Sequence, residues 1–457
     1  MKSSKYFLLI VFFVFLVSSA FTQTYNPDRK FSVKQLQEDF IKLRKLIEDN
    51  HPALYRYYDE AFFKNYFDSA YSLINREMTE LEFIRILEPM VAKVHCGHTE
   101  LWYSENFQNY IYTSGLFIPL SIHYIDNKAY ITRDFTENNI LAEGSEIILI
   151  NDVSVSLILK TLSASMNGDG FNKQNILFTI NKSPVSTLSK YFNYTDSYTI
   201  QFKKPDEINI STVTLEGIKY QKLVSVLNKR YNLDSENTDF SFKTLDSLNT
   251  AVITIHSFVM RENDNYYEFL KSSFNQIDSL NIQNLIIDVR GNDGGHPDYA
   301  IDLLRYLMDK DFVYFKTKVS NEKWNNFIKP YKNNFKGKVN ILINGGELST
   351  TGHFISLVKY HNIGTFIGRE SGSTFSCHDN SLRFVLPNTK INGKVARNTF
   401  ETAVTGLSWE NGLMPDYYVE QSLEDLLNGV DTIMEYTLNL IKHSKTPGAN
   451  IGIFITN

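Results

Sequence analysis

Ser349 is the side chain whose position in this sequence best suits nucleophilic chemistry. It follows an apolar run at 339–343 and the pair Gly345 and Gly346, and a stretch with helical spacing begins at Thr350. This order predicts a buried strand, a sharp turn and a helix that starts beside Ser349. The serine hydroxyl is then free of its own helix, and the amide of Thr350 points out of the helix start, where the dipole favours an oxyanion. The pattern suits acyl transfer, although a serine at a helix start also serves as an ordinary N-cap.

A second glycine-rich turn follows another apolar strand. Residues 285–289 run into a turn that ends at Gly294 and Gly295. Glycines at a strand end let the backbone approach a ligand closely, and their amides can face an anion. Such turns are common in α/β proteins, so this one gains meaning only together with the turn at Ser349.

The two turns together resemble the motifs of the C-terminal processing, or tail-specific, serine peptidases. The family pattern D-L-R-x-N-G-G-G is similar to residues 288–295, and its S-A-S-A-S-E pattern places the family's serine at Ser349. Residues 367–372 then resemble the G-E-x-T-G turn, and 410–416 resemble the closing G-V-x-P-D segment. The resemblance covers about 250–430. It implies a serine peptidase with an α/β catalytic domain of the ClpP/crotonase type.

The resemblance also implies a base. The tail-specific branch uses a lysine just after the G-E-x-T-G turn, but residues 373–375 contain none. The branch that includes the tricorn core protease uses a histidine from the N-terminal region, often in a D-G-H-T motif, and residues 96–99 match three of those four positions. His98 is therefore the expected base, and Glu410 the carboxylate that orients it. A structural histidine and a solvated glutamate are the alternatives, and His95 is expected to be packed or solvated.

The expected reaction is peptide-bond hydrolysis through an acyl-enzyme. His98 takes the Ser349 proton as the hydroxyl attacks the carbonyl, and Glu410 supports the imidazolium. No metal-ligand spacing or phosphate loop is evident, so we expect no metal and no cofactor. The alternatives are an inactive family member that binds peptides or proteins in the envelope, and Cys96 as the nucleophile. The amides expected to hold the oxyanion are those of Thr350 and of Gly294 or Gly295.

Three segments must position these residues. Residues 24–105 have helical spacing and form an N-terminal helical domain. Residues 106–220 carry mainly strand signals, with one or two helices. Residues 221–445 alternate strands and helices, which implies a largely parallel, covered sheet that carries the catalytic residues. The fold class is a multidomain α+β and α/β protein, which ends in a tail at 446–457.

Local signals also predict where several elements begin. Ser32 with Gln35, and Thr79 with Glu82, have the spacing of a capping box at a helix start. Residues 126–127 are turn formers between two β-rich runs, which favours a hairpin.

The second segment resembles the PDZ-like domain of these peptidases. Residues 142–151 look like the motif A-G-L-x-x-G-D-x-I-x-x-I-N. Such domains hold an extended peptide at a sheet edge. By this resemblance residues 113–117 supply a carboxylate-binding loop, with Gly115, Leu116 and Phe117 as weak candidates for peptide contacts. A PDZ-like spacer that binds nothing is the alternative.

Residues 1–20 have the composition of an export signal. Lys2 and Lys5 precede an apolar run at 6–17, and small residues at 18–20 suit signal peptidase. We expect cleavage after Ala20 and a periplasmic or extracellular protein without a stable membrane anchor. A retained anchor is the alternative.

The charge composition of the chain limits the classes of molecule that it is expected to bind. The chain has a formal net charge of −5, which argues against nucleic-acid binding, since that requires a basic surface. A peptide or protein substrate is the expected partner. Cys96 and Cys377 are the only cysteines, and they can pair or remain free thiols.

Overall fold

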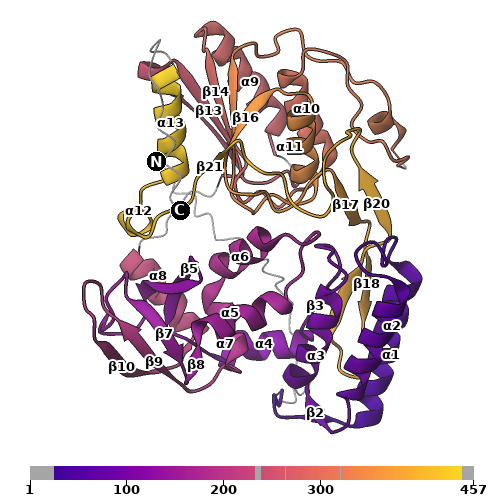
Figure 1. Cartoon of the computed structure of the whole chain (residues 1–457), viewed down its shortest axis with the longest axis vertical. Helices are drawn as coiled ribbons and strands as arrows, with labels where there is room; N and C mark the ends of the chain where they lie inside the picture. The colour runs from indigo at the N-terminus through magenta and orange to yellow at the C-terminus, as the bar shows by residue number, and fades with distance from the viewer. Residues whose placement is uncertain (1–24, 232–237, 263, 320, 445–457) are drawn as a thin grey trace.

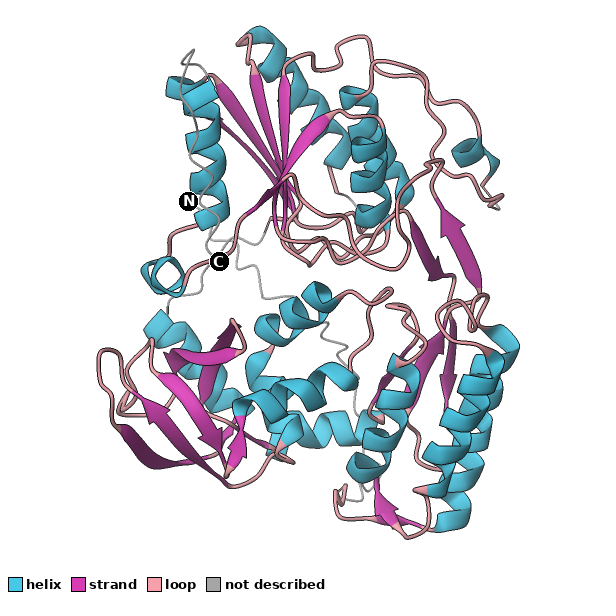
Figure 2. Cartoon of the chain, in the orientation of Figure 1, coloured by secondary structure: helices cyan, strands magenta, loops and turns pink. Residues whose placement is uncertain are grey.

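The computed structural model is a mixed α/β multidomain protein, as the sequence predicts (Figure 1). Helices and sheets are both present throughout (Figure 2). None of the helices in the described part of the chain is long and apolar enough to cross a bilayer. The predicted signal peptide at 1–20 and tail at 446–457 lie outside the described residues, which are 25–231, 238–262, 264–319 and 321–444.

A six-stranded sheet forms the centre of the C-terminal half. Its order is β12-β13-β14-β15-β16-β21, with β12 antiparallel to β13 and the other neighbours parallel. Parallel strands bring their carboxyl ends to one edge, so the turns after β14 and β15 meet there. The strands are β12 (Phe240–Leu245), β13 (Thr250–Ile255), β14 (Asn284–Asp288), β15 (Lys338–Ile343), β16 (Gly364–Gly368) and β21 (Tyr417–Tyr418).

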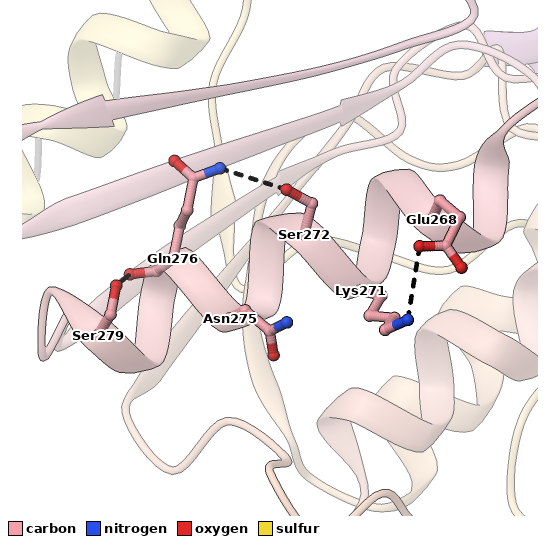
Figure 3. A pocket seen from close by; sticks show the side chains of 6 residues that line it. All are labelled: Glu268, Lys271, Ser272, Asn275, Gln276 and Ser279. Atoms are coloured by element: carbon pink, nitrogen blue, oxygen red, sulfur yellow. Dashed lines mark hydrogen bonds and ion pairs between the residues drawn. The ribbon is translucent and has the colours of Figure 1, made fainter.

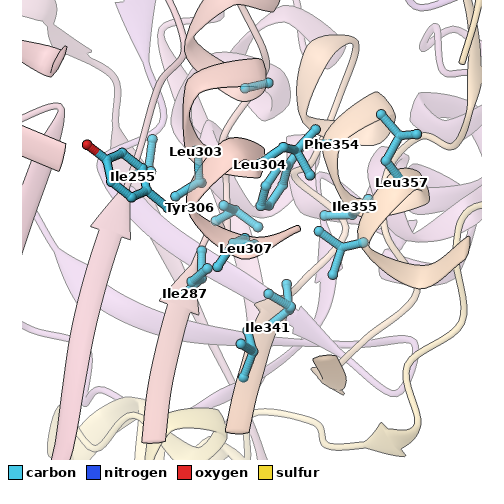
Figure 4. Packing of buried hydrophobic residues seen from close by; sticks show 14 of the residues in the cluster. Ile255, Ile287, Leu303, Leu304, Tyr306, Leu307, Ile341, Phe354, Ile355 and Leu357 are labelled. Atoms are coloured by element: carbon cyan, nitrogen blue, oxygen red, sulfur yellow. The ribbon is translucent and has the colours of Figure 1, made fainter. Parts of the chain in front are cut away.

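Helices cover both faces of this sheet. Ile287 and Ile341 pack toward α10 and α11, as Figure 4 shows, and the alternate residues Ile286 and Leu342 pack with residues of α13 on the other face. Side chains of a strand alternate between faces, so strands that are apolar throughout need this double cover. The helices are α9 (Tyr266–Ser279), α10 (Pro297–Leu307) and α11 (Thr350–Tyr360) on one face and α13 (Thr432–Ser444) on the other.

The N-terminal helices begin where the sequence predicts. Ser32 and Gln35 form a capping box at the start of α1 (Val33–Asn50), and Thr79 and Glu82 form another at the start of α3 (Glu80–Ala92). Between them lies α2 (Glu60–Ser72). The apolar faces of the three helices share one core.

A hairpin from the C-terminal half completes this helical unit. Its strands β18 (Leu382–Val385) and β19 (Asn392–Val395) join β3 (Glu100–Trp102) in one sheet. The fully buried carboxylate of Asp39 on α1 accepts hydrogen bonds from the loop residues Asn388 and Thr389. Residues 221–445 therefore do not pack as one separate unit, because this hairpin belongs to the core of the N-terminal helices.

The second segment is built on a sheet of order β10-β9-β7-β6-β5. Asp126 and Asn127 confirm the predicted hairpin, since both have positive φ (50° and 61°), which a two-residue turn of this type requires. The main strands are β5 (Leu120–Ile125), β6 (Lys128–Asp134), β7 (Glu146–Ile150), β9 (Ser197–Lys203) and β10 (Ile210–Glu216).

This segment holds more helix than the one or two elements expected. Residues 106–220 contain three complete helices and most of a fourth. Two of them are short and are separated only by Ser183, with Pro184 as the first residue of the second helix, so their helical spacing is weak in the sequence. The helices are α4 (Glu105–Ser114), α5 (Val155–Ala164), α6 (Lys173–Lys182) and α7 (Pro184–Tyr191).

Candidate active site

The two glycine-rich turns lie against each other at the carboxyl edge of the sheet. The Asn344 side-chain oxygen accepts hydrogen bonds from the amides of Gly291 and Gly346, at 3.0 and 3.2 Å. The Leu348 amide donates to the Asn292 carbonyl at 3.1 Å. These bonds fix the turn after β15 on the turn after β14, so each turn positions the other.

Ser349 has a strained backbone and a side chain that does not cap its helix. Its φ of 52° lies in the left-handed region, and its hydroxyl makes no capping hydrogen bond to α11. A residue with a Cβ is costly there, by about 1–3 kcal/mol, and persists only where its surroundings impose the conformation. Ser349 therefore occupies the N-cap position of α11, but its side chain does not act as the cap. The hydroxyl stands outside the helix, as a nucleophile requires.

Two backbone amides beside Ser349 are free to bind an oxyanion. Among the described residues, the amides of Thr350 and Gly295 donate to no protein acceptor, whereas the Gly294 amide donates to the Asn292 side chain at 2.9 Å. Of the two glycines, Gly294 already uses its amide in this hydrogen bond. A Cβ on Gly294, whose φ is +100°, would lie 2.8 Å from the Ser349 Cβ, so this position requires glycine.

A buried carboxylate, Glu347, clamps the turn that carries Ser349. Its two oxygens accept hydrogen bonds from the amides of Asn344 and Gly345, both at 2.9 Å. The side chain is fully buried, and burial raises its pKa to about 7 although these backbone donors favour the charged form. The sequence analysis did not predict a role for Glu347. A charged residue in the turn between the buried strand and Ser349 was the sequence feature that could have indicated one.

The structure brings His98 toward the helix that starts beside Ser349. His98 has an electrostatic interaction with His353, which lies one turn along α11 from Ser349. Its Nε2 lies 3.7 Å from the Asp379 carboxylate on β17 (Ser376–Asp379). The ring is mostly buried, with a side chain 16% exposed. The N-terminal unit thus lies close to β17 and to α11 at His98.

Cys96 and Cys377 are both buried free thiols, and Cys96 lies near His98 and Cys377 near Ser349. The Cys377 sulfur lies 3.4 Å from Nε2 of His353, and the Ser349 hydroxyl interacts with this thiol. Burial raises the pKa of Cys96 to about 12, which keeps that thiol protonated. A thiolate is the reactive form of cysteine, so the structure disfavours Cys96 as the nucleophile.

Glu410 is not in contact with His98. Its side chain is exposed and, among the described residues, forms no hydrogen bond or ion pair. Its carbonyl accepts a hydrogen bond from the amide of Phe171 at 2.7 Å. The carboxylates that face His98 are instead those of Asp169 and Asp379.

His95 is packed, as expected. One ring nitrogen lies 2.7 Å from the Gly170 carbonyl, and the ring packs on Phe171 with centroids 4.9 Å apart. Burial lowers its pKa, so the neutral form is favoured.

The weak peptide-binding candidates lie at the end of α4 and the strand that follows it. Gly115 is the C-cap of α4, and Leu116 and Phe117 form β4 (Leu116–Phe117), which pairs with β11 (Ile218–Lys219). Phe117 lines a cavity of about 900 Å³ between the N-terminal helices and the second segment. A smaller hollow of about 430 Å³ lies on the polar side of α9 and contains no predicted site residue (Figure 3).

Comparisons with known proteins give one family match and several proteins of similar fold. Residues 249–419 match the family model of peptidase family S41. Mature CPAF has a similar structure, with a TM-score of 0.65 and 13% identity over 92% of this chain and 99% of that chain. The structure of mature CPAF complexed with lactacystin has a TM-score of 0.65 and 12% identity, over 90% of this chain and 98% of that chain. The photosystem II D1 C-terminal processing protease has a TM-score of 0.44 and 13% identity, over 89% of this chain and 97% of that chain. No curated protein sequence matches the chain significantly.

Proposed function

Because residues 249–419 belong to peptidase family S41, which makes the chain a serine-type peptidase, we propose that it cleaves peptides or proteins through an acyl-enzyme on Ser349. The observation that carries this proposal is the left-handed Ser349, which does not cap its helix and stands beside the free amides of Thr350 and Gly295. A hydroxyl beside two unused donors is the arrangement that acyl transfer requires.

His98 is proposed as the base of this reaction. It takes the Ser349 proton while the oxygen attacks the substrate carbonyl, and it returns that proton to the amine as the C–N bond breaks. Water then attacks the acyl-enzyme by the same route and regenerates the serine. Each amide that holds the oxyanion contributes on the order of 3 kcal/mol to the transition state. The position of His98 against α11 and the match at 96–99 support this role.

Three finer features remain part of the proposal. We propose that the enzyme is exported, which the composition of residues 1–20 supports. We propose that the second segment is PDZ-like and holds the substrate, for which the cavity beside Phe117 offers room. Glu410 stays a prediction as the supporting carboxylate, and it would have to leave its exposed position to contact His98.

Cleavage of an unfolded protein substrate by the purified chain tests the proposal. Ser349→Ala should abolish cleavage and leave the fold intact, and His98→Gln should lower the rate by about 10²–10⁴-fold. Ser356→Ala, which removes a fully buried hydroxyl from the same helix, is the matched control and should stay active. The wild-type rate should rise with pH, because a general base must be unprotonated to accept the serine proton.

Three results would count against the proposal. Undiminished cleavage by Ser349→Ala would exclude this serine as the nucleophile. Unchanged cleavage by His98→Gln would exclude His98 as the base. A wild-type chain that cleaves no substrate would favour the inactive peptide-binding alternative.

A further inference from the structure

A buried carboxylate from the second segment, Asp169, lies beside the proposed base. It is only 8% exposed and belongs to the loop between α5 and α6. Its Oδ1 accepts a hydrogen bond from the Gly97 amide at 2.8 Å, so it holds the residue next to His98. A Cβ on Gly97 would lie 3.4 Å from the same oxygen, which shows how closely the two segments pack.

This loop is attached to the catalytic turns as well. The Asn175 side chain donates to the Gly345 carbonyl at 3.0 Å, in the turn that leads to Ser349. The Asn172 side chain caps α6 and also donates to the Ser371 carbonyl. Asp169 is therefore held by the same framework that positions the nucleophile. A catalytic group needs this kind of rigid support.

Two polar atoms at the contact are buried without partners. Neither Oδ2 of Asp169 nor Nδ1 of His98 has a partner at hydrogen-bond distance within the described part of the chain, although the Ser373 hydroxyl also interacts with this carboxylate. Leaving such atoms unpaired is unfavourable, so buried polar atoms normally find a partner. The two residues already interact electrostatically. A hydrogen bond from the imidazole N–H to the carboxylate would satisfy both atoms.

We propose that Asp169 is a positioning residue for His98. Its carboxylate accepts the Nδ1 proton, which selects the tautomer whose Nε2 can take a proton from Ser349, and its charge stabilises the imidazolium that results. This inference rests on the proposed roles of Ser349 and His98. It assigns to the second segment a direct part in the chemistry, in addition to any part in holding substrate.

Other charged groups surround this pair. Asp379 is the competing carboxylate, but it faces Nε2 rather than Nδ1 and its side chain is 44% exposed, so solvent screens its charge. Burial raises the pKa of Asp169, and the nearby His98 opposes part of that shift. The remaining titratable or charged groups that face His98 or Asp169 are Arg56, Tyr57, Cys96, His353, Cys377 and His378.

Asp169→Asn tests the proposal because it keeps an oxygen for the Gly97 amide and removes the charge. The variant should lose at least 10-fold in kcat with little change in KM. The rising part of its pH profile should move toward lower pH, since a carboxylate no longer favours the imidazolium. Asp169→Glu should recover part of the rate. Asp379→Asn removes the competing carboxylate, and a larger loss of kcat in that variant than in Asp169→Asn would overturn the proposal.

The tautomer of His98 gives a readout that needs no Asp169 variant. In ¹⁵N-histidine spectra of the wild-type enzyme, the signal that His98→Gln removes should report protonated Nδ1 and bare Nε2 at high pH. Protonated Nε2 there would overturn the proposal. The proposal would also be overturned if folded Asp169→Asn had the same kcat and the same pH profile as the wild type. If instead Ser349→Ala or His98→Gln keeps full activity, the proposed function has failed, and the two failures are distinguishable.

Discussion

The clamp formed by Glu347 predicts how the stability of the catalytic domain depends on pH. The ordinary pKa of this carboxyl is 4.5, and burial raises it to about 7 in the folded protein. Below pH 4.5 the group is protonated in both states. Between pH 4.5 and about 7 this carboxyl is ionised in the unfolded chain but still protonated in the folded protein. The free energy of unfolding therefore falls as pH rises. At about 1.36 kcal/mol per pH unit, the loss amounts to roughly 3 kcal/mol by pH 7, and it is constant above that.

Glu347→Gln isolates this effect because glutamine cannot ionise. Urea unfolding of both proteins from pH 4 to pH 8 gives the difference in free energy, in which the other titrating groups cancel. The free energy of unfolding of the wild type minus that of the variant should fall by roughly 3 kcal/mol from pH 4 to pH 8. Glu262→Gln, on the surface, is the matched control. A difference that rises with pH would refute the reasoning, because the backbone donors to Glu347 would then outweigh its burial.

Two further substitutions test the framework around the site. Gly294→Ala should reduce peptide cleavage more than 100-fold, because its Cβ would collide with Ser349 and a positive φ disfavours alanine; a fully active variant in the cleavage assay would contradict this packing. Asp39→Ala should lower the free energy of unfolding by about 3 kcal/mol, since it leaves the amides of Asn388 and Thr389 unpaired; a loss below 0.5 kcal/mol in urea unfolding would show that this loop is not held by Asp39.

Local patterns were sufficient for the elements that carry the nucleophile. The apolar run of β15, the glycine pair after it and the helical spacing from Thr350 predicted the strand, turn and helix that the structure shows. Capping boxes and the hairpin at 126–127 were equally local. In each case the signal and the structure involve residues within a few positions of one another.

The parts that sequence reasoning missed depend on contacts between distant segments. Whether Gly294 or Gly295 offers a free amide is decided by the Asn292 side chain, which occupies one of them. The proximity of Asp169 to His98 arises from packing between the second segment and the N-terminal unit. No periodicity or spacing encodes such a contact. The exposed position of Glu410 likewise follows from the path of its loop.

Covalent labelling with a fluorophosphonate tests the central claim most directly. The probe reacts with an activated serine, and mass spectrometry of the digested protein locates it. We predict one adduct, on the peptide that contains Ser349, which forms faster as pH rises and more slowly in His98→Gln. Ser356→Ala should be labelled like wild type. An adduct that persists in Ser349→Ala, or that maps to another serine in the wild type, would contradict the assignment of Ser349 as the nucleophile.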